Sequence, residues 1–297
     1  MQFKIRTLVL AICLAGSGIA SADIDNYTTG NGELFFAVYD PVAKVSYALD
    51  LPLNGANAAA YSDDADSTFN LNHFLPAGVG AVAGENPPGT VTTPGTEFRW
   101  NINTADADWV NFVNGVSAGG SSSAAWKWGV FAGDNTGAQT TPDKIRYLTT
   151  IAPGVTKASI EATQTITNLV AFNGTESLFV AAGNSVTPVG DHDFFAAFAN
   201  GNRYFGIGFE ENWKGKASFN ATAGFGTAAQ FAYLTGRNTG FALATIYQNG
   251  ATWRLHSPES GQFQLAYTVP VPEVDTWAMF AAGLVMVGTI ARRRMKV

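Results

Sequence analysis

Short segments in which apolar and polar residues alternate occupy much of the chain. The clearest pair, residues 33–39 and 44–51, flanks Asp40 and Pro41 in "GELFFAVYDPVAKVSYALDL". Alternate side chains point to opposite faces of a strand, and Asp-Pro favours a turn, so this segment predicts a β-hairpin. "EFRWNI" predicts a strand over residues 97–102, and "AWKWGVFAGD" with "DKIRYLTTI" predicts a second hairpin.

Strand-like segments dominate after residue 193. They are "FFAAFANGNRYFGIGF", "KASFNATAGF", "GFALATIYQNGATWRLHS" and "QFQLAYTV". Asn200-Gly201 and Asn249-Gly250 predict tight hairpin turns, because both residue types accept a positive φ. The fold class expected is therefore mainly β, with a β-sandwich-like body and one or two short helices.

Two segments carry a helical period. After residue 102, Thr104 is expected to cap a short helix that ends at Gly115 and turns Trp109, Phe112 and Val113 toward the core. In residues 156–174, apolar and threonine positions recur at helical spacing before Asn-Gly. The threonines suit a strand equally well; we favour a helix there.

The N-terminus has the pattern of an export signal. Two basic residues precede an apolar stretch over residues 8–15, and small residues follow. Ala20 and Ala22 occupy the A-x-A positions that signal peptidase requires, with Asp23 as the first mature residue. Residues 1–22 therefore predict a signal peptide on an exported chain.

An uncharged apolar run occupies residues 277–291, directly before a basic tail. As a helix it would extend somewhat over about 20 Å, against a bilayer core of about 30 Å. Trp277 suits one membrane interface, and Arg292, Arg293 and Arg294 suit the cytoplasmic side of the other. The run predicts a single transmembrane helix in the inner membrane, with the body outside the cytoplasm.

This tail resembles the PEP-CTERM sorting signal. The resemblance rests on Pro272, Glu273, Trp277 and a glycine-spaced apolar helix followed by three arginines, within residues 270–297. Val274 stands where the family has its second proline. The signal occurs on exported proteins of Gram-negative bacteria that make extracellular polysaccharide. The resemblance implies that an exosortase recognises the tail and cleaves near it, releasing the body to the cell surface.

Composition limits the function of the body, residues 23–269. Without the terminal segments, 11 basic and 21 acidic residues remain, which gives a net charge near −10. Such a surface repels nucleic acid and anionic lipid, so we expect neither as a partner. The single cysteine, Cys13, lies in the signal peptide, which excludes disulfides and thiolate chemistry from the mature chain.

Two acidic segments are candidate calcium sites. Asp63, Asp64 and Asp66 lie in "YSDDADSTFN", and Asp191 and Asp193 flank a histidine in "GDHDF". Carboxylate oxygens suit Ca²⁺. The first segment lacks the glycine and glutamate of an EF-hand loop, and solvated surface is the favoured interpretation of both segments. We therefore expect no cofactor; if a metal binds, it is expected to be Ca²⁺ and not zinc or a redox metal.

Trp126 and Trp128 share one face of a predicted strand, which is the geometry of a sugar-stacking surface, but packing in the core is the favoured interpretation. Glu210 and Glu211 are adjacent, so in a strand they would point to opposite faces and form no glycosidase pair. No catalytic motif was found.

The favoured function is therefore a non-enzymatic cell-surface or matrix protein associated with extracellular polysaccharide and biofilm. A secreted carbohydrate-binding module is the alternative, and a secreted hydrolase the third. The expected partners are signal peptidase and exosortase during export, and then extracellular polysaccharide.

Overall fold

Strands account for most of the regular structure. The computed structural model describes residues 34–51, 71–74, 91, 93–135, 145–164, 193–208, 210–213, 215–235, 245–248, 250–271 and 284–286. The strands are β1 (Phe35–Asp40), β2 (Val45–Asp50), β3 (Glu97–Asn101), β4 (Lys127–Asn135), β5 (Ile145–Ile151), β6 (Asp193–Ala197), β7 (Ala223–Gly224), β8 (Ala228–Thr235), β9 (Thr245–Tyr247), β10 (Thr252–His256) and β11 (Gln264–Thr268). The helices are α3 (Ala107–Ala118), α4 (Lys157–Thr163) and α6 (Phe205–Gly208), with 3₁₀ turns η2 (Leu71–Phe74), η3 (Ser123–Ala125) and η5 (Phe198–Arg203).

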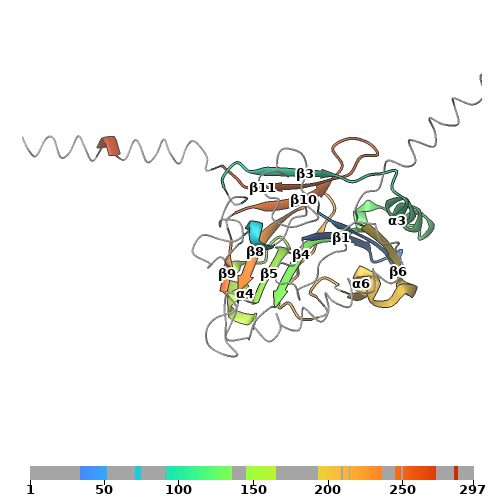
Figure 1. The fold of residues 1–297 in the computed structure, drawn as a ribbon, viewed down its shortest axis with the longest axis horizontal. Coiled ribbons are helices and arrows are strands. Elements are labelled where there is room, and N and C mark those ends of the chain that lie inside the picture. The colour runs from blue at the N-terminus through green and yellow to red at the C-terminus, as the bar shows by residue number, and fades with distance from the viewer. Residues whose placement is uncertain are drawn as a thin grey trace, which may run out of the picture.

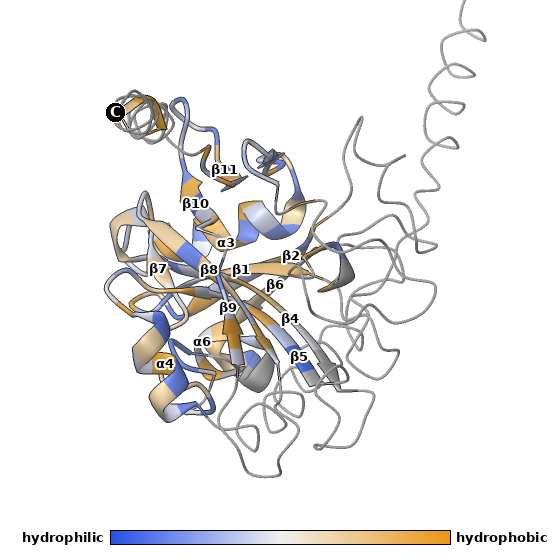
Figure 2. Cartoon of the chain, turned by 90° about the vertical axis from the view of Figure 1, so that its left-hand side faces the viewer, coloured by the Kyte–Doolittle hydropathy of each residue, from blue (hydrophilic) through white to orange (hydrophobic). Residues whose placement is uncertain are grey.

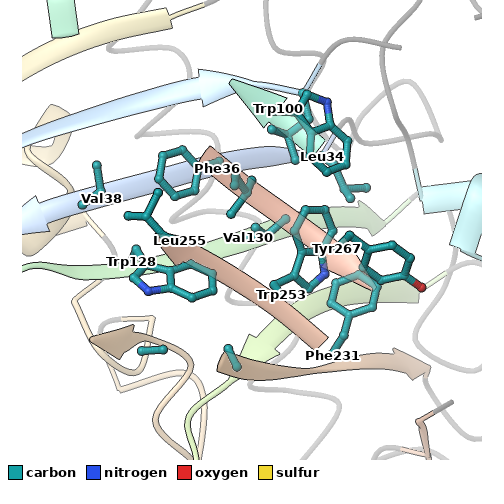
Figure 3. Packing of buried hydrophobic residues seen from close by; sticks show 14 of the residues in the cluster. Leu34, Phe36, Val38, Trp100, Trp128, Val130, Phe231, Trp253, Leu255 and Tyr267 are labelled. Carbon is teal, nitrogen blue, oxygen red and sulfur yellow. The ribbon is translucent and has the colours of Figure 1, made fainter. Parts of the chain in front are cut away.

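All eleven strands belong to one antiparallel sheet in the order β3-β11-β10-β8-β5-β4-β1-β2-β6, with β7 paired to β4 and β9 to β8 (Figure 1). The mainly β prediction is confirmed. The expected arrangement of two packed sheets differs from the structure, in which one sheet curls like a half-barrel. Although four strand-to-strand steps separate β10 from β1, Leu255 and Phe36 belong to the same buried cluster, and Figure 3 shows them close together.

The predicted hairpins β1–β2 and β4–β5 are confirmed by their antiparallel pairing. Asp40 forms the first turn: its Oδ1 accepts from the amides of Val42 and Ala43, both at 2.8 Å. The amide of Lys44 donates to the Asp40 carbonyl at 2.8 Å, and Lys44 has φ +56°. This left-handed position usually holds glycine, because a Cβ is disfavoured there.

Helix α3 is present, but both of its predicted ends are wrong. Asp106, not Thr104, is the N-cap, accepting from the amides of residues 108 and 109 at 2.8 and 3.2 Å. Gly115 lies inside the helix, where a Cβ would come within 2.9 Å of Val45 Cγ1. This glycine therefore allows close packing on β2 and does not end the helix.

Both predicted Asn-Gly hairpin turns are corrected by the structure. Asn200 lies in η5, and its Oδ1 accepts from the Ala197 amide at 2.7 Å, so the chain turns into a 3₁₀ helix after β6. Gly250, with φ +78°, lies between β9 and β10, which pair with successive parts of β8. Strands β9 and β10 therefore both pair with β8 and not with each other; Asn249 lies outside the described residues.

The helix favoured after residue 156 is confirmed where the structure describes that segment, whereas a later predicted strand is shorter than expected. In residues 156–174 the structure describes α4, capped where Thr156 Oγ1 accepts from the Ser159 amide at 3.2 Å; residues 165–174 lie outside the described part. The strand predicted over residues 216–225 is reduced to β7.

The sheet is buried on both faces. We call the inner face the concave side, where Trp100, Trp109, Trp128, Trp253 and Tyr267 pack with α3. The outer face is the opposite side, where Tyr147, Phe205 and Trp213 pack with α4 and α6. Figure 2 shows α3 on one side of the strands and α4 and α6 on the other. Because curling buries the inner face and the helices and the segment after α6 cover the outer face, one sheet produces the alternation that suggested two.

No helix in the described residues is long and apolar enough to cross a bilayer. Of the predicted sorting helix the structure describes residues 284–286, which are helical and exposed. The signal peptide and its cleavage site, and the sorting residues Pro272, Glu273, Trp277, Arg292, Arg293 and Arg294, lie outside the described residues.

Candidate functional site

The two tryptophans predicted to stack on sugar are core residues. Trp126 is 3% exposed and Trp128 is fully buried. The Trp126 ring packs against Phe263 at 5.4 Å between centroids, and Trp128 Nε1 donates to the Gly224 carbonyl at 2.9 Å. Both share the inner face, as the alternation indicated, but that face is the interior of the curl. The favoured interpretation, packing in the core, is therefore confirmed, and the sugar-stacking alternative is wrong because neither ring is open to a ligand.

The predicted calcium residues fall mostly outside the described part. Asp63, Asp64, Asp66 and Asp191 are not described; the backbone of Asp193 begins β6, opposite Leu49. In the residues that are described, no three His, Cys, Asp or Glu side chains gather as a metal site would require.

A pocket of about 840 Å³ opens on the outer face beside the first hairpin. The β1–β2 turn, η5, α6 and the segment after α6 form its walls. Its aromatic lining residues are Tyr39, Phe198, Tyr204 and Phe219. Its polar lining residues are Lys44, Glu210, Glu211, Asn212, Ser218 and Asn220. We call this pocket the groove.

Phe198 is the exposed ring of the groove. It is 51% exposed, whereas the other three aromatic lining residues are buried. The Nζ atom of Lys44 lies 4.7 Å from the centroid of the Phe198 ring, within cation–π range. Tyr204 contacts Phe198 with a centroid distance of 6.1 Å and an interplanar angle of 65°. Lys44 and Tyr204 therefore hold the Phe198 ring in place, and the rest of the ring surface is open to a ligand.

Two buried phenols, Tyr39 and Tyr204, lie beneath the exposed ring. Their rings meet edge to face at 6.3 Å, and the Tyr204 hydroxyl donates to the Asp40 carbonyl at 3.2 Å. Burial, followed by the nearby Asp40 and Glu210 carboxylates, raises the pKa of Tyr204 to about 12. Burial and then Glu211 also raise the pKa of Tyr39 well above its ordinary value. Both groups remain neutral phenols at physiological pH.

Glu210 and Glu211 both line the groove, unlike the opposed arrangement that a strand would give, because they lie in a turn. Glu210 has φ +54°. Glu211 is held on both oxygens: Oε1 lies 3.4 Å from Lys127 Nζ, and Oε2 accepts from Asn220 Nδ2 at 3.2 Å. The groove thus contains one anchored carboxylate and a neighbouring one on a strained backbone.

The segment that carries these groups is tied to the sheet by hydrogen bonds. We call residues 204–222 the outer strap; residues 209 and 214 are outside the described part. Thr150 Oγ1 donates to the Ala221 carbonyl at 2.7 Å and accepts from the Val130 amide at 3.1 Å. Gln164 is fully buried; its Nε2 donates to the Lys216 carbonyl at 3.0 Å and its Oε1 accepts from the Ser218 amide at 2.8 Å.

Trp213 anchors the middle of the outer strap. It is fully buried with φ +55° and packs edge to face on Phe131 at 6.4 Å and on Phe219 at 5.7 Å. This burial keeps a non-glycine residue in a left-handed conformation, and so fixes the turn that presents both glutamates. The strap is therefore a shaped support for the groove.

No family model matches the chain, and the comparisons found neither a curated protein nor a solved structure that matches it. The residues that line the groove indicate what it can bind. It offers an apolar ring, carboxylate, amide and hydroxyl groups on one surface. Rings cover the apolar faces of a sugar while carboxylates and amides bind its hydroxyls, so this lining suits a glycan.

Sequence reasoning missed the groove because its lining comes from distant segments. Phe198 was assigned to a strand, and the Glu-Glu pair was judged by the geometry of a strand. A signal was nevertheless present: "FANGNRYF" and "FEENWKGKASFN" combine aromatic, amide and charged residues more densely than a core strand does.

Proposed function

We propose that the protein is an exported, PEP-CTERM-type cell-surface protein whose β-rich body associates with extracellular polysaccharide through the groove. Signal peptidase and exosortase process the two ends, and the body acts by binding, without catalysis. The observation that carries the binding role is the half-exposed Phe198 ring beside amide and carboxylate side chains. The predicted export and sorting signals place such a surface among glycans.

Binding is favoured over hydrolysis by the state of the two glutamates. A glycosidase needs two carboxyl groups on opposite sides of the bond that is cleaved. Here Glu211 is committed to Lys127 and Asn220, and Glu210 is its immediate neighbour in one turn. Neither arrangement supplies an acid and a nucleophile facing each other across a substrate.

The binding role is tested with the protein purified from the cell surface and polysaccharide from the same culture. We expect Phe198→Ala to weaken retention about tenfold, the loss of roughly 1.4 kcal/mol of ring contact. Val42→Ala is the matched control, because Val42 is 61% exposed at the hairpin tip but does not line the groove. Equal retention of both variants would remove the groove from the proposal, and shortening of the polysaccharide would establish a hydrolase.

The sorting role is tested separately in cells. We expect the mature protein to begin at Asp23 and to lack the arginine tail, which intact-mass measurement reads directly. Replacing Arg292, Arg293 and Arg294 by alanine should weaken membrane retention or reverse orientation of the precursor. A mature protein that keeps the tail would reject exosortase processing.

A further inference from the structure

An ammonium group already occupies part of the groove. Lys44 holds its Nζ atom 4.7 Å from the centroid of the Phe198 ring. It does so from a backbone with φ +56°, a conformation that favours glycine. No carboxylate of the described residues lies within ion-pair distance of this Nζ. The exposed ring and its surroundings therefore hold an ammonium group without a salt bridge.

Two polar groups in the groove are left for a ligand. The carboxylate of Glu210 forms no ion pair or hydrogen bond with the part of the chain that the structure describes. Tyr39 is 5% exposed and lines the groove, and its hydroxyl has no hydrogen-bond partner among the described residues. This hydroxyl is not among the fully buried polar atoms that lack a partner, so it reaches the groove and can bond there to water or to a ligand group.

The Phe198 ring, the Glu210 carboxylate and the Tyr39 hydroxyl together favour a ligand with a positive charge. A ring face attracts an ammonium group through its quadrupole, and an unpaired carboxylate attracts it through its charge. A carboxylated sugar would instead be repelled by the unpaired Glu210, and an N-acetylated sugar would offer it no charge. The lining thus distinguishes sugars by their nitrogen substituent.

We propose that the groove recognises the free amino groups of an amino-sugar polymer, with Phe198, Glu210 and Tyr39 as the recognition residues and Lys44 as an internal occupant that the ligand displaces. This proposal rests on the proposed glycan-binding function and narrows it to one class of glycan. The polymer is one whose amino groups are not acetylated.

Calorimetry with the full-length protein in detergent tests this with oligomers of equal length. We expect glucosamine oligomers to bind at least about tenfold more tightly than N-acetylglucosamine or glucuronate oligomers. Glu210→Gln, which keeps the size of the side chain, should weaken glucosamine binding about fivefold to tenfold. Glu259→Gln, at an exposed carboxylate outside the groove, should leave it unchanged.

Lys44 supplies a test of opposite sign. Lys44→Gln removes a competing charge, so glucosamine oligomers should bind several-fold more tightly, whereas an acidic glycan would bind more weakly. A gain for the acidic glycan, or no effect on either, would overturn the role of Lys44 as an occupant.

The remaining outcomes separate this inference from the function it rests on. If acetylated and free-amine oligomers bind equally and Phe198→Ala abolishes both, glycan binding stands and amine recognition is overturned. If no oligomer binds while the polysaccharide of the culture is still retained, amine recognition is overturned and glycan binding stands; if neither binds, both are overturned. Spermidine binding as tightly as the glucosamine oligomer would overturn the assignment to a sugar, because charge alone would then account for binding.

Discussion

The two faces of the curled sheet are held by different forces. On the inner face, aromatic rings contact one another directly: Trp253 lies 4.9 Å from Tyr267 and 5.3 Å from Trp100 between centroids (Figure 3). On the outer face, the strap combines a few rings with hydrogen bonds from buried polar side chains such as Thr150 and Gln164. The stability from apolar packing depends on how completely side chains fill the available volume, whereas the strength of a hydrogen bond depends on its geometry.

This difference separates stability from the placement of functional groups. The inner face takes rings from both ends of the sheet and fixes the curl of a chain whose single cysteine is Cys13. The outer face positions a turn with two left-handed non-glycine residues beside the groove. We therefore expect inner-face substitutions to change stability and outer-face substitutions to change binding as well.

The largest expected effect is on the inner face. Trp253→Ala should lower the free energy of unfolding by about 3–5 kcal/mol, because a fully buried indole leaves a cavity in the curl. Urea denaturation measures this loss. The variant that remains folded should keep its affinity for the groove ligand. A matching loss of affinity would show that the two faces are coupled.

An intermediate effect is expected where the outer strap meets α4. Gln164→Leu leaves the Lys216 carbonyl and the Ser218 amide without their partner, at a cost of about 1–3 kcal/mol in unfolding free energy. Hydrogen exchange of the Ser218 amide should accelerate, and binding in the groove should weaken.

Gln248→Leu is the control, since the longer contact of Gln248 with Gln230, at 3.4 Å, is exposed. We expect a change within about 0.5 kcal/mol there. Equal destabilisation by the two variants would remove the special role of the strap contacts.

The smallest expected effect is a change in the pH dependence of the free energy of unfolding, and it comes from Tyr204 on the outer face. Burial raises the pKa of Tyr204 to about 12 from an ordinary value near 10, so the folded state keeps a proton that the unfolded chain releases. The stability from this group is fully present below pH 10 and is lost as pH rises through 12. Tyr204→Phe should cost about 1 kcal/mol at neutral pH, by removing the bond to the Asp40 carbonyl, and should show a smaller alkaline loss.

Urea denaturation of the Tyr204→Phe variant at neutral pH and near pH 12 measures both the stability lost at neutral pH and the further loss at alkaline pH. An unchanged alkaline decline in this variant would assign the decline to other groups. Burial also raises the pKa of Tyr39, so this residue is the next one to replace by phenylalanine.

The strands were predictable and the curvature was not. Hairpins such as β1–β2 follow from local alternation and an Asp-Pro turn, which neighbouring residues determine. Curling brings Phe36 into one buried cluster with residues more than 200 positions later, and alternation looks the same in a sandwich and in a curled sheet. The groove was missed for a related reason: Glu210 and Trp213 have left-handed backbones in a turn whose ring contacts come from Phe131, a residue distant in the sequence.

The open edge of the curled sheet bears on how the protein would behave at high concentration. In the described part of the chain β3 pairs with β11 alone, and two of its three exposed side chains are charged, with Arg99 Nη2 lying 2.6 Å from Glu97 Oε1. Charges on an edge strand oppose the addition of a strand from another molecule. Many copies concentrated in one layer would therefore stay separate particles, joined by whatever they bind and not by growth of their sheets into fibres.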